Sequence, residues 1–264
     1  MLKDLVETAY RTFAAYSAPE DSGCQCPLCR LGESHKRLRA MAVREIPDEL
    51  LWRYHFAAHG ETTPVREIKH FLPRYLEIVS HFQFEHFWAE IALDRLSLAK
   101  DEWTTEEQAL LETWARAFFA HCLSRYHDRD FAPDAPYIEN IVDLIIMLAH
   151  GDFDLRPLLG DWSKNPSLSA LLHFKDLLLW GFNKDMSALE NSFAADDKAL
   201  CAMLADWVRQ PDVAAHFVAI CDKAIEGGEP ILDMAHACHA GRAHREELRS
   251  IRQKLGEWQR LLNS

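Results

Sequence analysis

Glycine and proline are scarce in this chain of 264 residues, at 10 and 11 residues, which excludes collagen-like and linker-like proteins. β-Branched residues are also few, because Val, Ile and Thr together number 27 against 34 Leu and 33 Ala. Leu and Ala favour helix, whereas β-branched residues favour strand. No apolar run approaches the ~20 residues of a membrane span. The composition therefore argues against a sheet protein and predicts no membrane helix.

The common sequence signatures of enzymes are missing as well. The chain has no Gly-x-Gly-x-x-Gly, no phosphate-binding loop ending in Lys-Ser/Thr, no Gly-x-Ser-x-Gly and no His-Glu-x-x-His. A net charge of -12 and a pI near 5.6 argue against nucleic-acid binding, which needs clustered Lys and Arg for phosphate contacts. We therefore expect a basic protein partner, and neither nucleic acid nor membrane.

Apolar residues recur at spacings of three and four along most of the chain, which predicts an all-α fold of about a dozen short to medium helices. We expect an irregular bundle or a solenoid-like array, with no sheet beyond an isolated pair. Pro73 predicts a kink or break at Leu72. Residues 104–107 form a capping box that starts a long helix. The predicted helices span residues 2–16, 47–59, 64–82, 84–99, 105–126, 137–150, 155–159, 167–180, 196–209, 211–227, 230–239 and 242–262.

The domain organisation is predicted to be simple. Residues 1–264 form a single all-α domain, and the segment 128–136, with Pro133 and Pro136, is the best candidate for a joint between sub-domains. The helix at 137–150 is apolar on most of its sides, so we expect it to be buried.

Seven cysteines are present, and three of them lie within residues 24–29. The first residues are already charged, so we expect no signal peptide and a cytoplasmic, reducing compartment. Clustered cysteines in that compartment favour metal or redox chemistry over disulfides. Four further cysteines occupy apolar helical positions and are predicted to be core residues. These are Cys122, Cys201, Cys221 and Cys238.

The Cys-rich segment has the donors of a structural zinc site. Cys26 and Cys29 are two residues apart with Pro27 between them, a tight turn that lets two thiolates face one ion. Zn²⁺ takes four N or S ligands, and Cys24 and His35 are the nearest third and fourth donors. The alternative is three free thiols in a loop, because structural sites usually draw two pairs of ligands from separated segments.

A redox function competes for the same residues. Cys26-Pro27-Leu28-Cys29 resembles the dithiol of glutaredoxin-type proteins, in which a helix start lowers the pKa of the first thiol. Those proteins place a strand before the dithiol, and the sequence predicts none here. Glu67 and His70 have the spacing of a di-iron ligand pair, but such a site needs two further carboxylates. Buried or capping histidines are the simpler interpretation.

Charge is distributed unevenly along the chain. Residues 130–161 carry seven acids and one base, which is half of the net charge, whereas residues 241–264 carry six bases and three acids. We expect part of the acidic stretch to meet a cationic partner; the alternative is a solvated surface without a partner. The expected partner-binding residues are Asp130, Asp134, Asp152, Asp154 and Asp161.

Two segments of the first hundred residues carry a resemblance to other proteins. Gly23-Cys24-Gln25-Cys26, followed by His70-Phe71-Leu72-Pro73-Arg74, resembles a set of bacterial all-helical proteins with no known activity. The resemblance implies a bacterial source and assigns no functional residue. The leading hypothesis is a non-enzymatic interaction protein, either an immunity protein (an antidote) that neutralises a basic toxin or an adaptor, with a structural zinc loop. The alternative is a cysteine-based redox or metal-dependent enzyme that uses Cys24 to Cys29.

Overall fold

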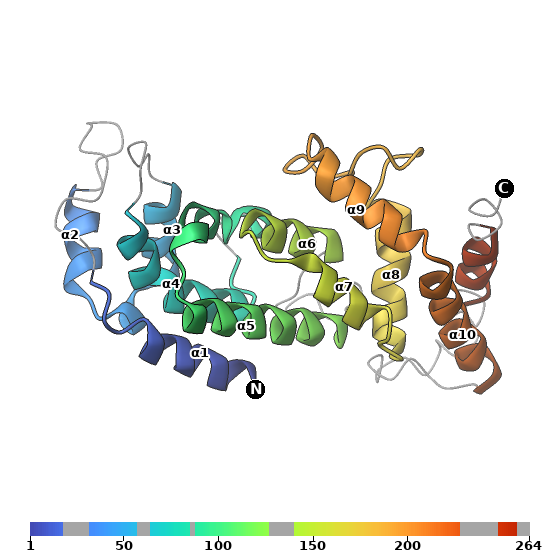
Figure 1. Cartoon of the computed structure of the whole chain (residues 1–264), viewed down its shortest axis with the longest axis horizontal. Helices are drawn as coiled ribbons and strands as arrows, with labels where there is room; N and C mark the ends of the chain where they lie inside the picture. The colour runs from blue at the N-terminus through green and yellow to red at the C-terminus, as the bar shows by residue number, and fades with distance from the viewer. Residues whose placement is uncertain (18–31, 57–63, 85–87, 127–139, 228–247, 258–264) are drawn as a thin grey trace. The chain divides into compact units, whose positions relative to one another are not determined.

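The computed structural model describes residues 1–17, 32–56, 64–84, 88–126, 140–227 and 248–257 (Figure 1). In these residues every regular element is a helix, and the only strand-like pairing is an isolated bridge between Phe182 and Leu189. The all-α prediction is therefore confirmed. Contacts divide the chain into two compact units. Unit 1 comprises Met1–Phe118 and Met147–Phe153, and unit 2 comprises Phe119–Ile146 and Asp154–Ser264.

Unit 1 is organised around helix α4 (Val65–Ser80). Helix α1 (Leu2–Thr12) and the 3₁₀ helices η1 (Val43–Glu45) and η3 (Asp94–Glu102) pack on it (Figure 1). Helix α2 (Gly32–Ala40) packs on α3 (Asp48–Phe56), and α5 (Thr105–Leu123) begins in this unit. Trp114 stacks on Phe118 with ring centroids 5.1 Å apart, and both side chains are fully buried.

Helix α4 runs through Pro73 without ending, so the predicted interruption does not break the helix. Proline in a helix interior costs ~3 kcal/mol. Burying one large apolar side chain contributes about 1.5–3 kcal/mol, and α4 buries Phe71, Leu72 and Leu76 at 1% exposure or less. The packing of both flanking turns therefore outweighs the missing hydrogen bond.

Two other predicted helices differ from the structure. Helix α1 ends at Thr12 rather than Tyr16. The predicted helix at 84–99 is instead the short 3₁₀ helix η2 (Ala89–Ile91) followed by η3, and residues 85–87 lie outside the described chain. Leu93, Leu96 and Ala99 are all buried. A spacing of three places them on one side of a 3₁₀ helix, which has three residues per turn.

Unit 2 holds the helices of the second half of the chain and a helical segment at residues 248–257. Helix α10 (Pro211–Gly227) packs on α8 (Leu168–Trp180) and α9 (Lys198–Val208). Helix α7 (Leu155–Trp162) starts at Asp154, whose side chain accepts a hydrogen bond from the Arg156 amide. Ser167 and Asp197 cap α8 and α9 in the same way, which satisfies amides that have no partner within the helix. Phe174 and Phe217 stack at 4.0 Å in the core.

Helix α6 (Ile141–His150) is buried on most sides, as its sequence predicts. Gly151 follows it, and a Cβ there would lie only 2.9 Å from the Phe153 ring and 3.2 Å from Leu93. The unit boundaries fall inside α5 and α6 and between Phe153 and Asp154. The predicted joint at 128–136 lies entirely outside the described residues, and the single-domain interpretation stays a prediction. Among the described helices, none has the length and apolarity needed to cross a bilayer.

Candidate functional site

The predicted zinc ligands are largely outside the described residues. Cys24, Cys26 and Cys29 fall in the segment 18–31, and His35 lies in α2, where its side chain is not among those described. In the described part of the chain, no three His, Cys, Asp or Glu side chains gather as a metal site. The zinc site and the redox dithiol therefore stay predictions.

Three of the four cysteines predicted to be core residues are buried in unit 2. Burial raises the pKa of Cys221 to about 11 and the pKa of Cys122 well above its ordinary value. These thiols are therefore protonated at neutral pH and unreactive. They are Cys122, Cys201 and Cys221, and Cys238 lies outside the described residues.

The chain just before the Cys-rich segment is held by a buried ion pair. The Lys69 ammonium lies 2.7 Å from the Glu107 carboxylate, with side-chain exposures of 6% and 3%. Lys69 also donates to the Glu102 carbonyl at 2.7 Å, and the Tyr16 hydroxyl donates to Glu107 at 2.7 Å. Burial alone would raise the pKa of Glu107, but the hydrogen bonds from Lys69, Tyr16 and the Thr104 amide lower it. The Tyr16 hydroxyl oxygen, 3.4 Å from the Lys69 ammonium, is a third acceptor, so every hydrogen of this ammonium has an acceptor within reach.

Two further residues of α4 hold the chain at Tyr16 and Ser17. The His70 Nδ1–H donates to the Tyr16 carbonyl at 2.8 Å, and Arg66 donates to the Ser17 hydroxyl at 2.6 Å. His70 is thus a structural hydrogen-bond donor and, with Glu67, belongs to no metal cluster among the described residues. Residue 17, directly before the Cys-rich segment, is therefore anchored on α4.

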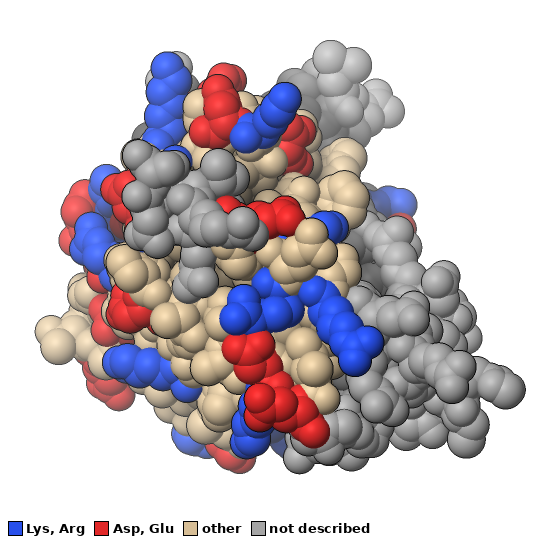
Figure 2. All heavy atoms as spheres, turned by 90° about the vertical axis from the view of Figure 1, so that its right-hand side faces the viewer, with Lys and Arg blue, Asp and Glu red and all other residues tan. Residues whose placement is uncertain are grey.

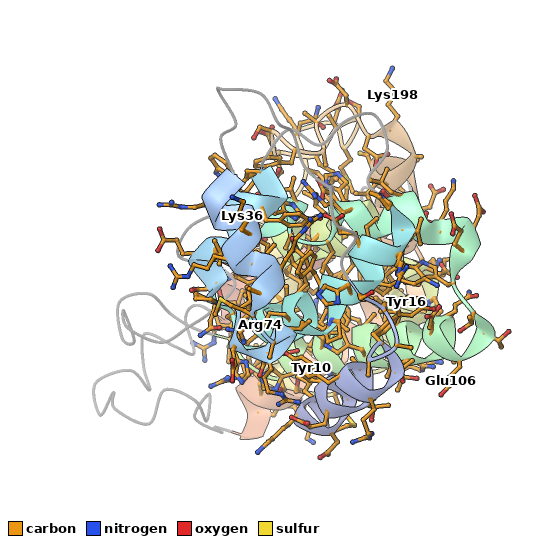
Figure 3. The ribbon with its side chains drawn as sticks, turned by 90° about the vertical axis from the view of Figure 1, so that its left-hand side faces the viewer. Tyr10, Tyr16, Lys36, Arg74, Glu106 and Lys198 are labelled. Carbon is orange, nitrogen blue, oxygen red and sulfur yellow. The ribbon has the colours of Figure 1, made fainter. Side chains whose placement is uncertain are left out.

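The predicted capping box is present and forms part of this network. The Thr104 hydroxyl accepts from the Glu107 amide at 3.2 Å, and the Glu107 carboxylate accepts from the Thr104 amide at 2.8 Å. The neighbouring Glu106 is exposed and points outward (Figure 3). One carboxylate, Glu107, therefore both starts α5 and neutralises the buried Lys69.

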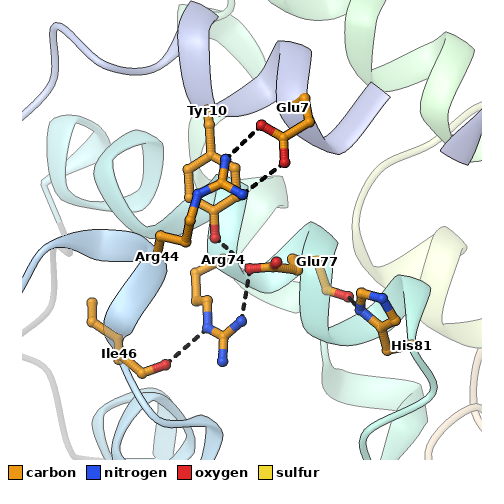
Figure 4. Close-up of polar contacts among 7 residues, drawn as sticks. All are labelled: Glu7, Tyr10, Arg44, Ile46, Arg74, Glu77 and His81. Atoms are coloured by element: carbon orange, nitrogen blue, oxygen red, sulfur yellow. Dashed lines mark hydrogen bonds and ion pairs between the residues drawn. The ribbon is translucent and has the colours of Figure 1, made fainter. Parts of the chain in front are cut away.

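A second polar cluster joins α1, η1 and α4 (Figure 4). The Tyr10 hydroxyl donates to Glu77 at 2.5 Å, and Arg74 donates to the same carboxylate at 2.7 Å. Arg44 makes two hydrogen bonds of 2.7 Å to Glu7, and its guanidinium lies 4.0 Å from the centre of the Tyr10 ring. Burial and the Glu77 carboxylate raise the pKa of Tyr10. The cluster is satisfied internally and attaches α1 to α4.

A third cluster, which we call the His55 cluster, consists of His55, Tyr75, Asp94 and Arg95. His55 Nε2 lies 3.0 Å from the Ile91 carbonyl, an acceptor, so this nitrogen carries the hydrogen. Nε2 is also 3.2 Å from Asp94, and Nδ1 lies 3.3 Å from the Tyr75 hydroxyl. A cavity of about 10 Å³ beside these residues has room for a single water molecule at most.

Arg95 explains why this cluster forms at the end of α3. Its guanidinium donates to the carbonyls of Tyr54 and His55, which lie in the last turn of α3 and have no amide partner within the helix. A cation at this end also interacts favourably with the helix dipole. Burial lowers the pKa of Arg95, but the group stays charged at neutral pH. The cluster therefore fixes the orientation of the last residues of α3.

Two exposed aromatic side chains, Phe56 and Trp88, pack on each other beside His55, and we call them the aromatic pair. Phe56 is 45% exposed and Trp88 is 61% exposed. Their ring centroids are 6.4 Å apart at 86°, and the Phe56 ring lies 5.3 Å from the His55 ring at 83°. Large exposed aromatic residues on a rigid base are typical of protein-binding surfaces. This is the most distinctive surface feature of unit 1 in the described residues.

The predicted acidic patch is only partly described. Asp130 and Asp134 lie outside the described residues. Asp152 is exposed in unit 1, whereas Asp154 and Asp161 are exposed in unit 2, where Asp154 caps α7. Their role as a partner-binding face stays a prediction.

The sequence patterns did not indicate the His55 cluster, the aromatic pair or the Lys69–Glu107 pair. The capping box was a signal for Glu107, but nothing in the pattern shows that the Lys69 ammonium reaches it. A comparison with family models, curated proteins and solved structures finds no match for this chain. Its function is therefore inferred from its sequence and its geometry.

Proposed function

We propose that this chain is a non-enzymatic interaction protein that binds a cationic protein partner, as an antidote to a basic toxin or an adaptor does. The observation that carries the proposal is the exposed aromatic pair, whose Phe56 ring packs on the buried His55 ring. Binding energy at protein interfaces concentrates in a few aromatic residues of this kind. Because the supporting cluster is already ordered, little conformational entropy is lost on binding.

The charge of the partner follows from the charge of the chain. The net charge of -12 attracts a basic protein and speeds its association. Asp94, whose side chain is 44% exposed, places a carboxylate at the edge of the His55 cluster. We therefore expect a contact in which the aromatic pair supplies apolar burial and nearby acids select a cation.

The test is a quantitative pull-down from a lysate of the source cells, with the double variant Phe56→Ser/Trp88→Ser beside wild type. The matched control is Leu98→Ser, because Leu98 is 59% exposed on η3 in the same unit. Wild type and control should recover one basic protein, whereas the double variant should recover about a tenth as much or less. Equal recovery by all three proteins would refute the proposal.

The Cys-rich segment carries a separate, structural proposal. We propose that Cys26 and Cys29, with Cys24 and His35, hold one Zn²⁺. The supporting observation is that Ser17 is fixed on α4 by Arg66, and that α2 begins at Gly32. A zinc ion between these points would tie both ends of the segment to unit 1, since binding of a structural metal contributes to folding free energy.

Elemental analysis of protein purified without chelator tests the zinc proposal, with one zinc per chain as the expected result. A Cys26→Ser/Cys29→Ser variant should lose the zinc, whereas Cys201→Ser, at a buried position in unit 2, should retain it. Zinc-free wild type with a reversible Cys26–Cys29 disulfide would instead support the redox alternative.

A further inference from the structure

A groove in unit 2 lies between α8 and the helical residues 248–257, and it is independent of the aromatic pair. Its volume is about 230 Å³, below the ~300–1,000 Å³ of sites for drug-sized ligands. Four aliphatic side chains line it, namely Leu178, Leu179, Ile251 and Leu255. The size suits a short aliphatic chain and is too small for a helix of a partner protein.

The walls of this groove are already fixed. Ile251 and Leu255 are 4% and 2% exposed. Arg252 lies 2.6 Å from Asp222 of α10, and the Cys221 thiol donates to the Leu248 carbonyl at 3.2 Å. These contacts hold residues 248–257 against α10, so a ligand meets a preformed surface.

The α8 side of the groove is ordered in the same way. The Lys175 ammonium donates to the Tyr126 hydroxyl at 3.1 Å and pairs with Asp176 at 3.2 Å. Its charge is thereby neutralised, and its hydrocarbon stem contributes to the apolar wall. Lys175 therefore offers a ligand apolar contact rather than charge.

The other lysine that lines the groove, Lys254, differs from Lys175 in its ion pairing. Its ammonium has no ion pair in the part of the chain that the structure describes. The Glu257 carboxylate also lines the groove and accepts a hydrogen bond from Gln253 at 2.8 Å. Lys254 also lies in the basic segment 241–264 of an otherwise acidic chain. Figure 2, which faces the side of α8 and α10, shows Lys and Arg side chains at several places on this face, and Asp and Glu side chains lie directly beside the central ones.

From the aliphatic groove and the Lys254 ammonium beside it, we propose that unit 2 binds an aliphatic carboxylate, namely a free fatty acid of short to medium chain length. The hydrocarbon chain lies along Leu178, Leu179 and Leu255, and the carboxylate pairs with the Lys254 ammonium. Burial of each methylene contributes ~0.8 kcal/mol, and the charge-assisted hydrogen bond selects an anionic head group.

Calorimetric titration of the full-length protein with decanoate, below its micelle concentration, tests this site. Decanoate should bind at one site per chain, and decyltrimethylammonium, with the same tail and the opposite charge, should bind at least about tenfold more weakly. Lys254→Glu and Leu179→Gln should each weaken decanoate binding by about tenfold or more. The matched control is Lys198→Glu, an exposed lysine at the start of α9.

The proposal would be overturned by no binding of decanoate to wild type, by equal binding of the two surfactants, or by undiminished binding by Lys254→Glu with an unchanged melting temperature. Preferential binding to anionic lipid vesicles rather than to the free carboxylate would also overturn it. The Phe56→Ser/Trp88→Ser protein should bind decanoate as wild type does, so this test and the partner pull-down can fail separately.

Discussion

Lys69 and Glu107 form a buried ion pair in unit 1, with side-chain exposures of 6% and 3%. Removing one member of a buried ion pair leaves an uncompensated charge and costs about 3–5 kcal/mol. We predict that Glu107→Gln lowers the free energy of unfolding by this amount, measured by urea denaturation. Its control, Glu106→Gln, alters an exposed carboxylate and should change stability by less than about 0.5 kcal/mol. Equal effects of the two variants would contradict the assignment.

The same pair makes stability depend on pH. The pKa of Glu107 is lowered in the folded protein from its ordinary value of 4.5, so its contribution is complete above that pH and disappears as the pH falls through the folded pKa. We predict that the stability difference between wild type and Glu107→Gln is constant from neutral pH down to 4.5 and shrinks below it. A difference that grew in acid would show that Glu107 is not held ionised.

Thiol reactivity separates the two groups of cysteines. Because Cys122, Cys201 and Cys221 are buried with raised pKa values, we predict that none is alkylated by iodoacetamide in the native protein at about pH 8. Peptide mapping by mass spectrometry should place the label at Cys24, Cys26 or Cys29, and only after chelation if zinc is bound. Fast native labelling of Cys122 would contradict the burial.

At the scale of elements, the start of α5 is set by a local motif. Loss of an N-cap hydroxyl costs about 0.5–2 kcal/mol, so Thr104→Ala should lower stability by that amount in thermal or urea denaturation. Thr105→Ala, one residue into the helix and also exposed, should have little effect. A larger loss of stability in Thr105→Ala than in Thr104→Ala would mean that α5 does not start at Thr104.

Helices α4 and η3 show how far the local sequence determines the form of a helix in this protein. Pro73 predicts an interruption, but buried side chains on both flanking turns keep α4 continuous. In η3 the spacing of Leu93, Leu96 and Ala99 is visible in the sequence, but a spacing of three fits one face of an α-helix as well as one side of a 3₁₀ helix. The continuity of α4 therefore depends on tertiary packing, and the local spacing in η3 does not by itself distinguish the two types of helix.

At the scale of the whole molecule, unit 1 is discontinuous in sequence. Residues 147–153 complete it, because His150 donates to the Glu90 carbonyl at 3.0 Å and the Phe153 ring lies 6.1 Å from that of Trp114. We predict that a fragment of residues 1–118 melts at lower temperature and over a broader range than the full chain, measured by circular dichroism. A fragment of 1–153 should recover more of the cooperativity. Full cooperativity of 1–118 alone would show that 147–153 is dispensable.

The sequence alone determined the helical class, the starts of several helices, the burial of α6 and the capping box at Thr104. Each of these follows from spacing or from a hydrogen bond within four residues, and such information is local. It also indicated the acidic charge and the candidate zinc donors.

Only the tertiary structure decided which distant residues meet. Lys69 is separated from Glu107 by 38 residues and His55 from Tyr75 by 20, and no periodicity relates them. The aromatic pair and the groove beside Lys254 arise for the same reason, because exposure depends on what the rest of the chain leaves uncovered. A buried charge or an exposed tryptophan is a property of the packed chain, since burial is a sum over neighbours that the linear order of residues does not specify.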